Sequence, residues 1–407
     1  MTTTTFAKPG SVAIESRALV PGPAAITAVA IALAAWYLNA AISWRQAALF
    51  LVGAGAGVVL YHAAFGFTSS WRVFIADRRG AGLRAQMLML AITCAAFFPL
   101  LAAGTVFGQT VRGSVSPIGV GVAAGAFIFG LGMQLGGGCA SGTLFSVGGG
   151  STRMLITLLF FILGSVIGTA HMGWWTAQPA FPATSLVTTM GPWAGLAASL
   201  VLFGAIAWLT IVAERKRHGQ LVDETKPALG PRWLSGPWPL VAGAIGLALV
   251  NVATLTIGGR PWGVTSAFAL WGAKWFAAIG IDVASWPYWT TPAQAAALKS
   301  SVLMDVTSVM DFGIILGALM AAFLAGKFAP VWKISGRSMA AAVIGGLLLG
   351  YGARIAYGCN IGAYFSGIAS GSLHGWLWLV AAFAGNIAGT NLRPMFDLKV
   401  ERTNNAC

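Results

Sequence analysis

Of the 407 residues, 57% are hydrophobic and only 8% are charged, whereas an ordinary soluble domain carries roughly 25% charged residues. Water cannot be the main solvent of such a chain, so a soluble fold is excluded. The formal net charge of +14 would suit a nucleic-acid-binding protein, but the basic residues gather in a few connecting segments. We therefore expect no nucleic-acid partner.

Long apolar stretches follow an N-terminal tail of residues 1–23. Each has about twenty residues with almost no ionisable group, the length that an α-helix needs to cross roughly 30 Å of hydrocarbon. The sequence therefore predicts an all-α, polytopic membrane protein in contact with lipid, with about nine or ten transmembrane helices. The predicted spans are 24–43, 46–64, 85–107, 117–135, 152–172, 192–213, 238–257, 301–325, 338–357 and 375–391.

Three segments between the spans concentrate the basic residues and predict the orientation. They are Arg72–Arg84, Glu214–Arg232 and Lys327–Arg337. By the positive-inside rule all three face the cytoplasm. Four predicted spans separate the first segment from the second and two separate the second from the third, so all three can share one side. We expect a multi-pass protein of the bacterial inner membrane.

Two parts of the chain repeat each other. Residues 345–366 (GGLLLGYGARIAYGCNIGAYFS) align without a gap on residues 125–146 (GAFIFGLGMQLGGGCASGTLFS), which places Cys359 on Cys139. Upstream of these, residues 65–71 (FGFTSSW) resemble residues 262–268 (WGVTSAF) in the other half. Each half therefore carries the same two signatures in the same order, which is typical of an internal structural repeat.

One predicted span, 192–213, has no match and lies between the two copies. A single intervening helix reverses the orientation of the second copy, so we predict two inverted repeats with broken or re-entrant helices. The predicted divisions are a first repeat with a leading helix, a linking helix with a basic cytoplasmic loop, a second repeat and a C-terminal tail: 24–191, 192–237, 238–391 and 392–407.

Each copy holds a glycine-cysteine site that is a candidate for substrate binding. The sites comprise Gly138, Cys139 and Ser141 in the first copy and Gly358, Cys359 and Asn360 in the second. Glycine breaks the helix there, and the following helical turn offers N–H donors and a dipole that attract an anion. Ser141 and Asn360 suit capping, and a thiol is a soft partner for a terminal sulfur atom. Cys94 lacks this context and is interpreted as apolar filler.

Other candidate residues flank these sites. Arg354 lies inside a predicted span, where an arginine would either steer a divalent anion or extend its charged end to the membrane interface. Thr68 and Thr265, in the paired upstream signatures, can donate hydroxyl hydrogen bonds to an oxyanion, and Gly66 belongs to the same signature. Two acids of the eighth span could serve proton coupling, pair with Arg354 or line a wet vestibule; they are Asp305 and Asp311.

The glycine-cysteine sites resemble signatures of a known family. GGGCASGTLFSVGGGS and YGCNIGAYFSGIASGSLHGWLW are similar to segments of the YeeE/YedE family of bacterial membrane proteins, which includes thiosulfate transporters, and the similarity extends over residues 46–391. The resemblance implies an hourglass-like helical fold in which Cys139 and Cys359 are two of three cysteines that pass thiosulfate along a central path. Gly66 stands where the family pattern has the third. A separate small cytosolic sulfur-carrier protein is the implied partner, since no sulfurtransferase domain follows the last span.

The sequence therefore predicts an inner-membrane transporter, and not an enzyme, for uptake of thiosulfate or a related small sulfur-containing anion. No motif calls for a cofactor or a metal. Two alternatives stay open: a thiol-based redox or persulfide protein, with covalent sulfur on Cys139 or Cys359, and a non-transporting sensor of a sulfur compound. Among transporters, selenium species, sulfite and sulfide stay open as substrates.

Overall fold

The computed structural model describes residues 21–222 and 232–400. Most of the predicted N-terminal tail, part of the segment Glu214–Arg232, and Cys407 lie outside these residues. The described chain is mostly helical, and its strands form just two short antiparallel pairs, β1 with β2 and β3 with β4. The predicted all-α fold class is confirmed.

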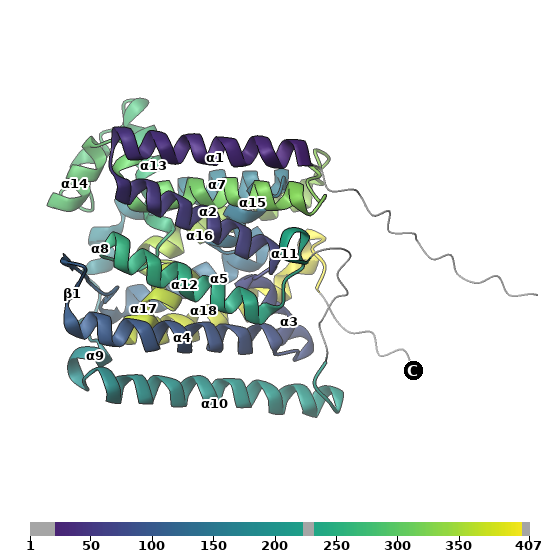
Figure 1. Ribbon diagram of the computed structural model, residues 1–407. Helices are drawn as coiled ribbons and strands as arrows, with labels where there is room; N and C mark the ends of the chain where they lie inside the picture. Colours follow the sequence, from purple (N-terminus) through teal and green to yellow (C-terminus); the bar gives the residue numbers. More distant parts are fainter. Residues whose placement is uncertain (1–20, 223–231, 401–407) are drawn as a thin grey trace, which may run out of the picture.

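Ten long helices run side by side through the molecule (Figure 1). Those of the first half are α1 (Pro21–Ala41), α2 (Trp44–His62), α4 (Ala81–Ala103), α5 (Val120–Gly136) and α7 (Thr152–Ala170). Those of the second half are α10 (Pro192–His218), α12 (Leu240–Gly258), α15 (Val306–Leu324), α16 (Gly336–Ile355) and α18 (Leu373–Leu392).

Shorter elements fill the remaining chain. Half-length helices enter the bundle at α3 (Phe67–Asp77), α6 (Ala140–Gly148), α13 (Thr265–Ala278) and the π-helix η3 (Asn360–Phe365), which continues as α17 (Ser366–Ala369). The connecting elements are β1 (Thr105–Val106), β2 (Gln109–Thr110), β3 (Ile118–Gly119), α8 (Met172–Thr176), β4 (Ala180–Phe181), α9 (Leu186–Thr189), α11 (Arg232–Ser235), η1 (Val283–Ser285), α14 (Pro292–Lys299), η2 (Val302–Met304) and η4 (Arg393–Phe396).

Nine helical segments within the described residues are long and apolar enough to cross a membrane. They coincide with nine of the ten predicted spans. The tenth, 375–391, corresponds to α18, which has 20 residues but is less apolar because it carries His374 and Asn386. The protein is therefore a polytopic α-helical membrane protein.

The two halves pack in matching pairs. The contact of α16 with α7 in one place corresponds to the contact of α5 with α18 in the other. In the same way, the contact of α15 with α2 corresponds to that of α4 with α12. Contacts of α5 with α16 and of α2 with α12 join the halves. Helix α10 packs on α4 as α1 packs on α15. The linking helix predicted at 192–213 corresponds to α10, whose packing on α4 resembles that of α1 on α15.

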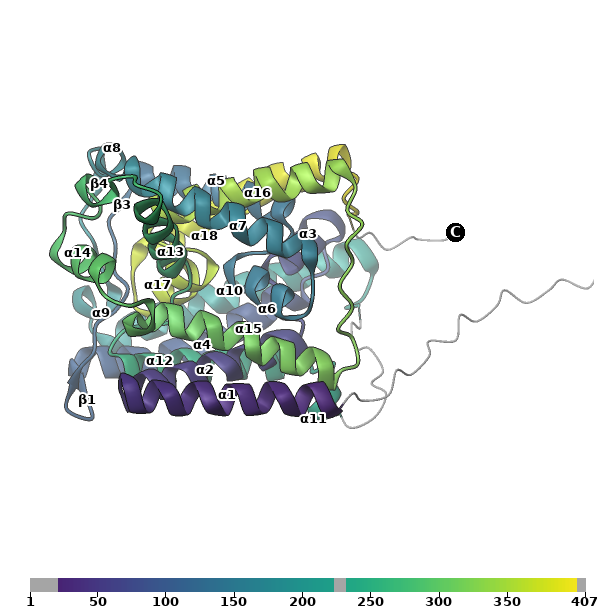
Figure 2. The same cartoon turned by 90° about the horizontal axis from the view of Figure 1, so that it is seen from above.

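The half-length helices enter the bundle from opposite ends. Figure 2 shows α3 and α6 toward the end where α11 lies, and α13 and α17 toward the end where α14 lies. We call these ends the α11 side and the α14 side. Counterparts on opposite sides are what two inverted repeats require. The C-terminal ends of α3, α10 and α15, which lie at the three basic segments, share the α11 side (Figures 1 and 2).

Several residues of the basic segments lie in helices, whereas the sequence had predicted loops for them. Arg72 is on α3, is buried, and donates from Nη1 to Gln134 Oε1 at 3.4 Å. Arg84 is in α4 and donates to Glu214 Oε2 of α10 at 2.6 Å. Glu214 is buried, so this ion pair fixes α10 against α4 at the α11 side.

Glycines bring paired helices into backbone contact. In the seam between α2 and α15, Gly53 and Gly57 lie on one helix and Gly313 and Gly317 on the other. A Cβ at Gly317 would lie 1.9 Å from the carbonyl oxygen of Ala54, far inside a normal contact. Small residues at such positions allow close helix packing in lipid, where burial of apolar surface gives no driving force.

Replacing Gly317 by valine is expected to destabilise the protein by about 1–3 kcal/mol, the usual cost of overpacking, because the added carbons meet the α2 backbone. Thermal unfolding in detergent measures the effect. Gly55→Val is the matched control, since a Cβ at Gly55 meets nothing within 4 Å. Equal melting temperatures for the two variants would contradict a tight seam.

Candidate functional site

The first cysteine site lies at the break between α5 and α6. Gly137 adopts φ +94° there, a left-handed conformation that glycine reaches without the penalty of a Cβ. Cys139 is the N-cap of α6, and its Sγ accepts the N–H of Gly142 at 3.4 Å. Ser141 Oγ lies 3.4 Å from the same sulfur. The thiol is therefore held at the positive end of the α6 dipole.

The second cysteine site lies where α16 ends. Tyr357 and Gly358 have φ of 58° and 150°. Cys359 caps the π-helix η3, and its Sγ accepts the N–H of Ile361 at 3.4 Å. Trp378 Nε1 donates to the Gly358 carbonyl at 3.2 Å. Because π-turns inside helices are rare and occur frequently at functional sites, η3 marks this break as a candidate site.

The structure brings the two cysteine sites together. Helix α6 contacts η3, so Cys139 and Cys359, which cap these two elements, lie on neighbouring segments. Both thiols are free and buried. Within the described residues, no cluster of three or more His, Cys, Asp or Glu side chains is placed to hold a metal ion.

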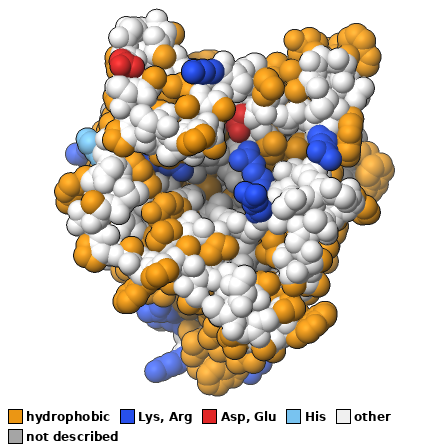
Figure 3. Space-filling view, turned by 90° about the vertical axis from the view of Figure 1, so that its left-hand side faces the viewer, with side chains coloured by type: hydrophobic (Ala, Val, Ile, Leu, Met, Phe, Trp, Pro, Cys, Tyr) orange, Lys and Arg blue, Asp and Glu red, His pale blue; other side chains and the backbone are white. Residues whose placement is uncertain are grey.

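A cavity of about 250 Å³ leads from the α14 side to the second cysteine site. Figure 3 looks onto this side and shows a central hollow with Lys or Arg side chains beside it. Arg112, Arg260 and Arg354 line the cavity, and Gly358 and Gly362, which flank Cys359, lie at its wall. Three positive charges thus surround an opening that approaches a buried thiol.

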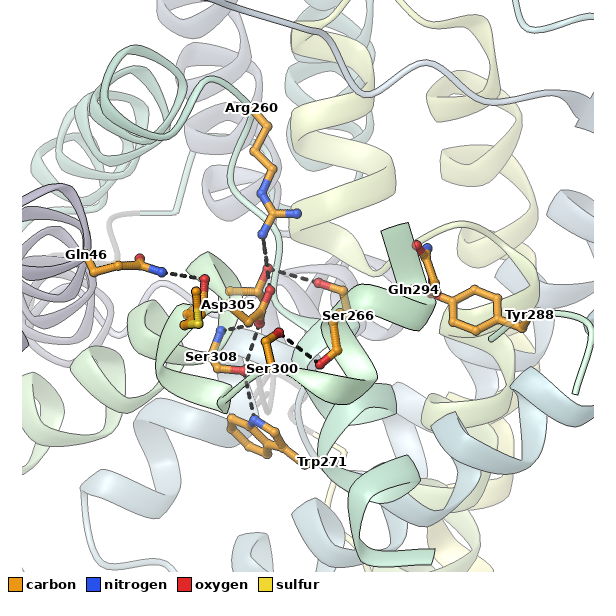
Figure 4. A network of polar contacts seen from close by, with 12 residues as sticks. Gln46, Arg260, Ser266, Trp271, Tyr288, Gln294, Ser300, Asp305 and Ser308 are labelled. Atoms are coloured by element: carbon orange, nitrogen blue, oxygen red, sulfur yellow. Dashed lines mark hydrogen bonds and ion pairs between the residues drawn. The ribbon is translucent and has the colours of Figure 1, made fainter. Parts of the chain in front are cut away.

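Arg354 lies at this cavity, as a steering role would require. Its Nη1 donates to the Tyr288 hydroxyl at 2.9 Å, and its guanidinium lies 4.9 Å from the centre of that ring. Its buried Nε has no hydrogen-bond partner among the described residues. The pairing of Asp305 with Arg354 is wrong, because Asp305 Oδ1 accepts from Arg260 Nη2 at 3.4 Å (Figure 4).

Three other predicted residues offer buried polar groups. Thr265 lines the cavity. Asn360 is fully buried, and neither Oδ1 nor Nδ2 has a partner among the described residues. The buried Thr68 Oγ1 is likewise unpaired. Since an unsatisfied buried polar group costs free energy, each of these atoms is a candidate contact for a ligand.

The two remaining predicted residues, Gly138 and Gly66, are glycines that allow close packing at the backbone. A Cβ at Gly138 would lie 2.9 Å from Met154 Cε, so glycine permits close packing there. Gly66 is the N-cap of α3, and Ser69 Oγ, which donates to its carbonyl, would lie 2.4 Å from an added Cβ. Gly66 does not line the cavity, whereas its counterpart Gly263 does.

The sequence analysis missed Arg112, Arg260 and Tyr288. Arg112 follows α4 and β2, Arg260 follows α12, and Tyr288 precedes α14. The two arginines lie in connections away from the basic segments, on the side that the positive-inside rule leaves poor in positive charge. Two arginines on this side are an exception to the rule, and in the sequence they were the signal for an anion-binding function.

A larger cavity of about 650 Å³ lies between the end of α2, the start of α4 and the segment before α12. Its lining includes His62, Arg84 and Lys327 together with many apolar side chains. No residue of η3 or α6 lines it, whereas Gly362 of η3 lines the smaller cavity. We therefore place the candidate site at the smaller cavity, where three arginines border the glycines on either side of Cys359.

Comparison with known proteins assigns the chain to a family. The family described as Sulphur transport matches residues 62–388. The chain belongs to this family. The matched region of the Sulphur transport family contains both cysteine sites and the three cavity arginines, so the resemblance noted in the sequence is confirmed.

Named relatives share different parts of the chain. Thiosulfate transporter TsuA of Spirochaeta thermophila is 28% identical over 358 residues, which cover 83% of this chain and 95% of that protein. Thiosulfate transporter TsuA of Escherichia coli K12 is 24% identical over 355 residues, 82% of this chain and 91% of the relative. Probable transporter YedE of Escherichia coli K12 is 30% identical over 171 residues, and the chain matches only 42% of the length of that protein.

Proposed function

We propose that this member of the Sulphur transport family takes up thiosulfate, or a closely related sulfur-containing anion, across the bacterial inner membrane. The observation that carries the proposal is the cavity lined by three arginines that approaches the Cys359 thiol. The basic segments of the α11 side would face the cytoplasm, so the cavity would open to the periplasm. The names of the TsuA relatives support thiosulfate as the substrate.

The cavity would act first by attraction. Positive charges around a concave opening raise the local concentration of an anion. As the anion leaves water it needs replacement donors. Arg354 at the cavity and Asn360, next to Cys359, each have an unpaired buried N–H group among the described residues. The Cys359 sulfur would then contact the terminal sulfur of the substrate, because soft, polarizable atoms suit one another.

The second thiol would take the substrate inward. Cys139 caps α6, which contacts η3, so a short movement carries the terminal sulfur from one thiol to the other. Residues 136–143 do not line the cavity. Aromatic packing surrounds η3: the Tyr364 ring stacks on Trp378 with centroids 6.1 Å apart, and Trp71 meets Tyr364 edge-on at 5.9 Å. In the proposed cycle this conformation would be open toward the α14 side, and these aromatic rings would close the path beyond Cys359.

Arginines also surround the break at the inner end of α5. Arg153 donates to the carbonyls of Gly136 at 2.7 Å and Leu135 at 2.6 Å, and Arg393 donates to the Gln134 carbonyl at 2.6 Å. Their positive charge would favour passage of an anion toward the cytoplasm. A small cytosolic sulfur-carrier protein is the proposed recipient there.

Replacing Arg260 or Arg354 by glutamine is expected to raise the KM for thiosulfate about tenfold, the effect of losing roughly 1.4 kcal/mol of interaction. The dependence of uptake on ionic strength should weaken as well, because salt screens charge attraction. Initial rates in proteoliposomes measure both. Arg45→Gln is the control, since Arg45 is exposed and does not line the cavity. Equal KM values for all three variants would contradict the steering role.

Flux measurements on the purified chain test the function itself. Proteoliposomes should accumulate radiolabelled thiosulfate, with unlabelled thiosulfate, sulfite, sulfate and selenite added as competitors to rank the substrates. Binding without accumulation would favour a sensor. Mass spectrometry of the intact protein after exposure to substrate should show no added sulfur, whereas covalent sulfur on Cys139 or Cys359 would favour the redox alternative.

A further inference from the structure

Asp311 is a buried acid in the membrane-crossing part of α15. Its side chain is fully buried, and neither carboxyl oxygen has a hydrogen-bond partner among the described residues. An ionised carboxylate without a donor is strongly disfavoured inside a bilayer. The structure therefore holds Asp311 as the neutral acid, with a proton that the transport steps described above do not use.

Few ionisable groups face this acid from the elements packed on α15. Helix α6 has none after its Cys139 cap, and α13 has Lys274, whose Nζ donates to the Leu298 and Ser300 carbonyls at 2.7 Å each. The ionisable groups of helices α1 and α2 lie near the helix ends; they are Tyr37, Arg45, Tyr61 and His62. No cation among these is placed to neutralise Asp311, since neither carboxyl oxygen has a partner in the described chain.

A chain of polar groups connects the region of Asp311 to the α14 side. Asp305, at the start of α15, accepts from the N–H and the Oγ of Ser308 at 2.8 Å each and contacts Arg260 at its other oxygen (Figure 4). Ser308 precedes Asp311 by three residues, so both side chains lie on one face of the helix. Protons from the cavity can thus come within one helical turn of the buried acid.

The acid also lies near the substrate path. Helix α6 contacts both α15, which carries Asp311, and η3, which Cys359 caps. Helix α15 packs against α6, which Cys139 caps, and against α13, which borders the cavity. A negatively charged substrate at either thiol would therefore be repelled by ionised Asp311 and tolerated by the neutral acid.

We infer that Asp311 is a proton-binding site that couples anion uptake to inward proton movement. The inference rests on the proposed transport function. On the α14 side, the carboxylate takes a proton from hydronium and releases water; the neutral acid then admits the anion. After the anion leaves on the α11 side, the acid returns the proton to water there, so that charge and atoms balance over one cycle.

The other half of the molecule supplies a comparison. Gln86 is the sixth residue of α4, as Asp311 is of α15, and α4 and α15 are counterparts in the packing. Gln86 is buried, and its Oε1 accepts from Trp71 Nε1 at 2.9 Å. The fold therefore accommodates a neutral amide at this place in one half, which makes Asp311→Asn a suitable substitution.

Proteoliposomes with the membrane potential clamped to zero test the coupling. With the outside one pH unit more acidic than the lumen, wild type should raise the thiosulfate accumulation ratio about tenfold per coupled proton, because one pH unit is a tenfold proton gradient. A lumenal pH dye should report acidification that depends on thiosulfate. Asp311→Asn should lose both effects yet retain counterflow of labelled thiosulfate, which needs no net proton movement. Asp311→Glu should keep both.

Asp397→Asn is the control acid, because Asp397 is exposed and pairs with Arg337 at 3.1 Å, and it should behave as wild type. Uptake by wild type without acidification, or acidification that persists in Asp311→Asn, would overturn the inference while leaving the transport function intact. If Asp311→Asn does not fold, the test rests on acidification of the lumen by wild type and by Asp311→Glu. Absence of acidification with either protein would overturn the inference. Absence of thiosulfate flux in wild type would instead refute the proposed function.

Discussion

Replacing Cys359 by serine is expected to lower thiosulfate uptake about tenfold, the loss that corresponds to roughly 1.4 kcal/mol. Serine is a favoured N-cap residue, so its hydroxyl can still accept the Ile361 N–H that Cys359 Sγ now accepts at 3.4 Å. The substitution therefore removes the soft sulfur and keeps the helix cap. Cys139→Ser should have a similar effect, because Cys139 caps α6 in the same way.

The double variant should lose more than either single variant but less than a hundredfold, because two neighbouring groups that share one substrate are not independent. Cys94→Ser is the matched control: Cys94 is also buried, but it lies within α4, with its Sγ 3.8 Å from the Ile368 carbonyl. Radiolabelled uptake in proteoliposomes, corrected for the amount of folded protein, gives the rates. Undiminished uptake by the double variant would contradict a contact between these thiols and the terminal sulfur of the substrate.

Gly263→Leu is expected to reduce uptake at least about tenfold by filling the cavity, because side chains at a constriction control passage through a pore. Gly263 lines the cavity, and a Cβ there would meet nothing within 4 Å. Its Cα lies 4.0 Å from the Cβ position of Gly362, the glycine after the Cys359 cap. The leucine side chain would therefore occupy open space next to the second cysteine site.

Gly263→Ala, with one added carbon, should give a much smaller loss in the same flux assay. Both variants should keep the melting temperature of the wild type, because the added atoms meet open space and no packed backbone. A leucine variant that transports at the wild-type rate would show that the substrate takes another route. A lowered melting temperature would show that the position is packed.

The membrane-crossing helices could be predicted from the sequence because their signal is local. Twenty apolar residues in a row indicate a span wherever they occur, and nine predicted spans match helices of the structure. The proximity of Cys139 and Cys359 followed from the repeat, because a pair of inverted copies places equivalent positions around a shared centre. The boundaries of the two repeats, and the roles of the site residues, stay predictions.

The half-length helices were harder to predict. Helix α3 has 11 residues, including Arg72, too few apolar residues in a row to be recognised as a span. It is stabilised by packing against α4, the next helix, and against α18, which lies about 300 residues further along the chain. The cavity arginines were missed for the same reason: Arg112 and Arg260 lie in separate connections, and the Arg112 N–H donates to the Gly259 carbonyl at 2.9 Å.

The glycine seams determine which parts of the protein can move. A Cβ at Gly345 of α16 would lie 2.1 Å from the Gly136 nitrogen of α5, as close as the contacts between α2 and α15. Helices in backbone contact have no layer of flexible side chains between them that could absorb sliding. These four helices therefore form two rigid pairs, and a gate for the substrate has to be built from the short segments α3, α6, α13 and η3.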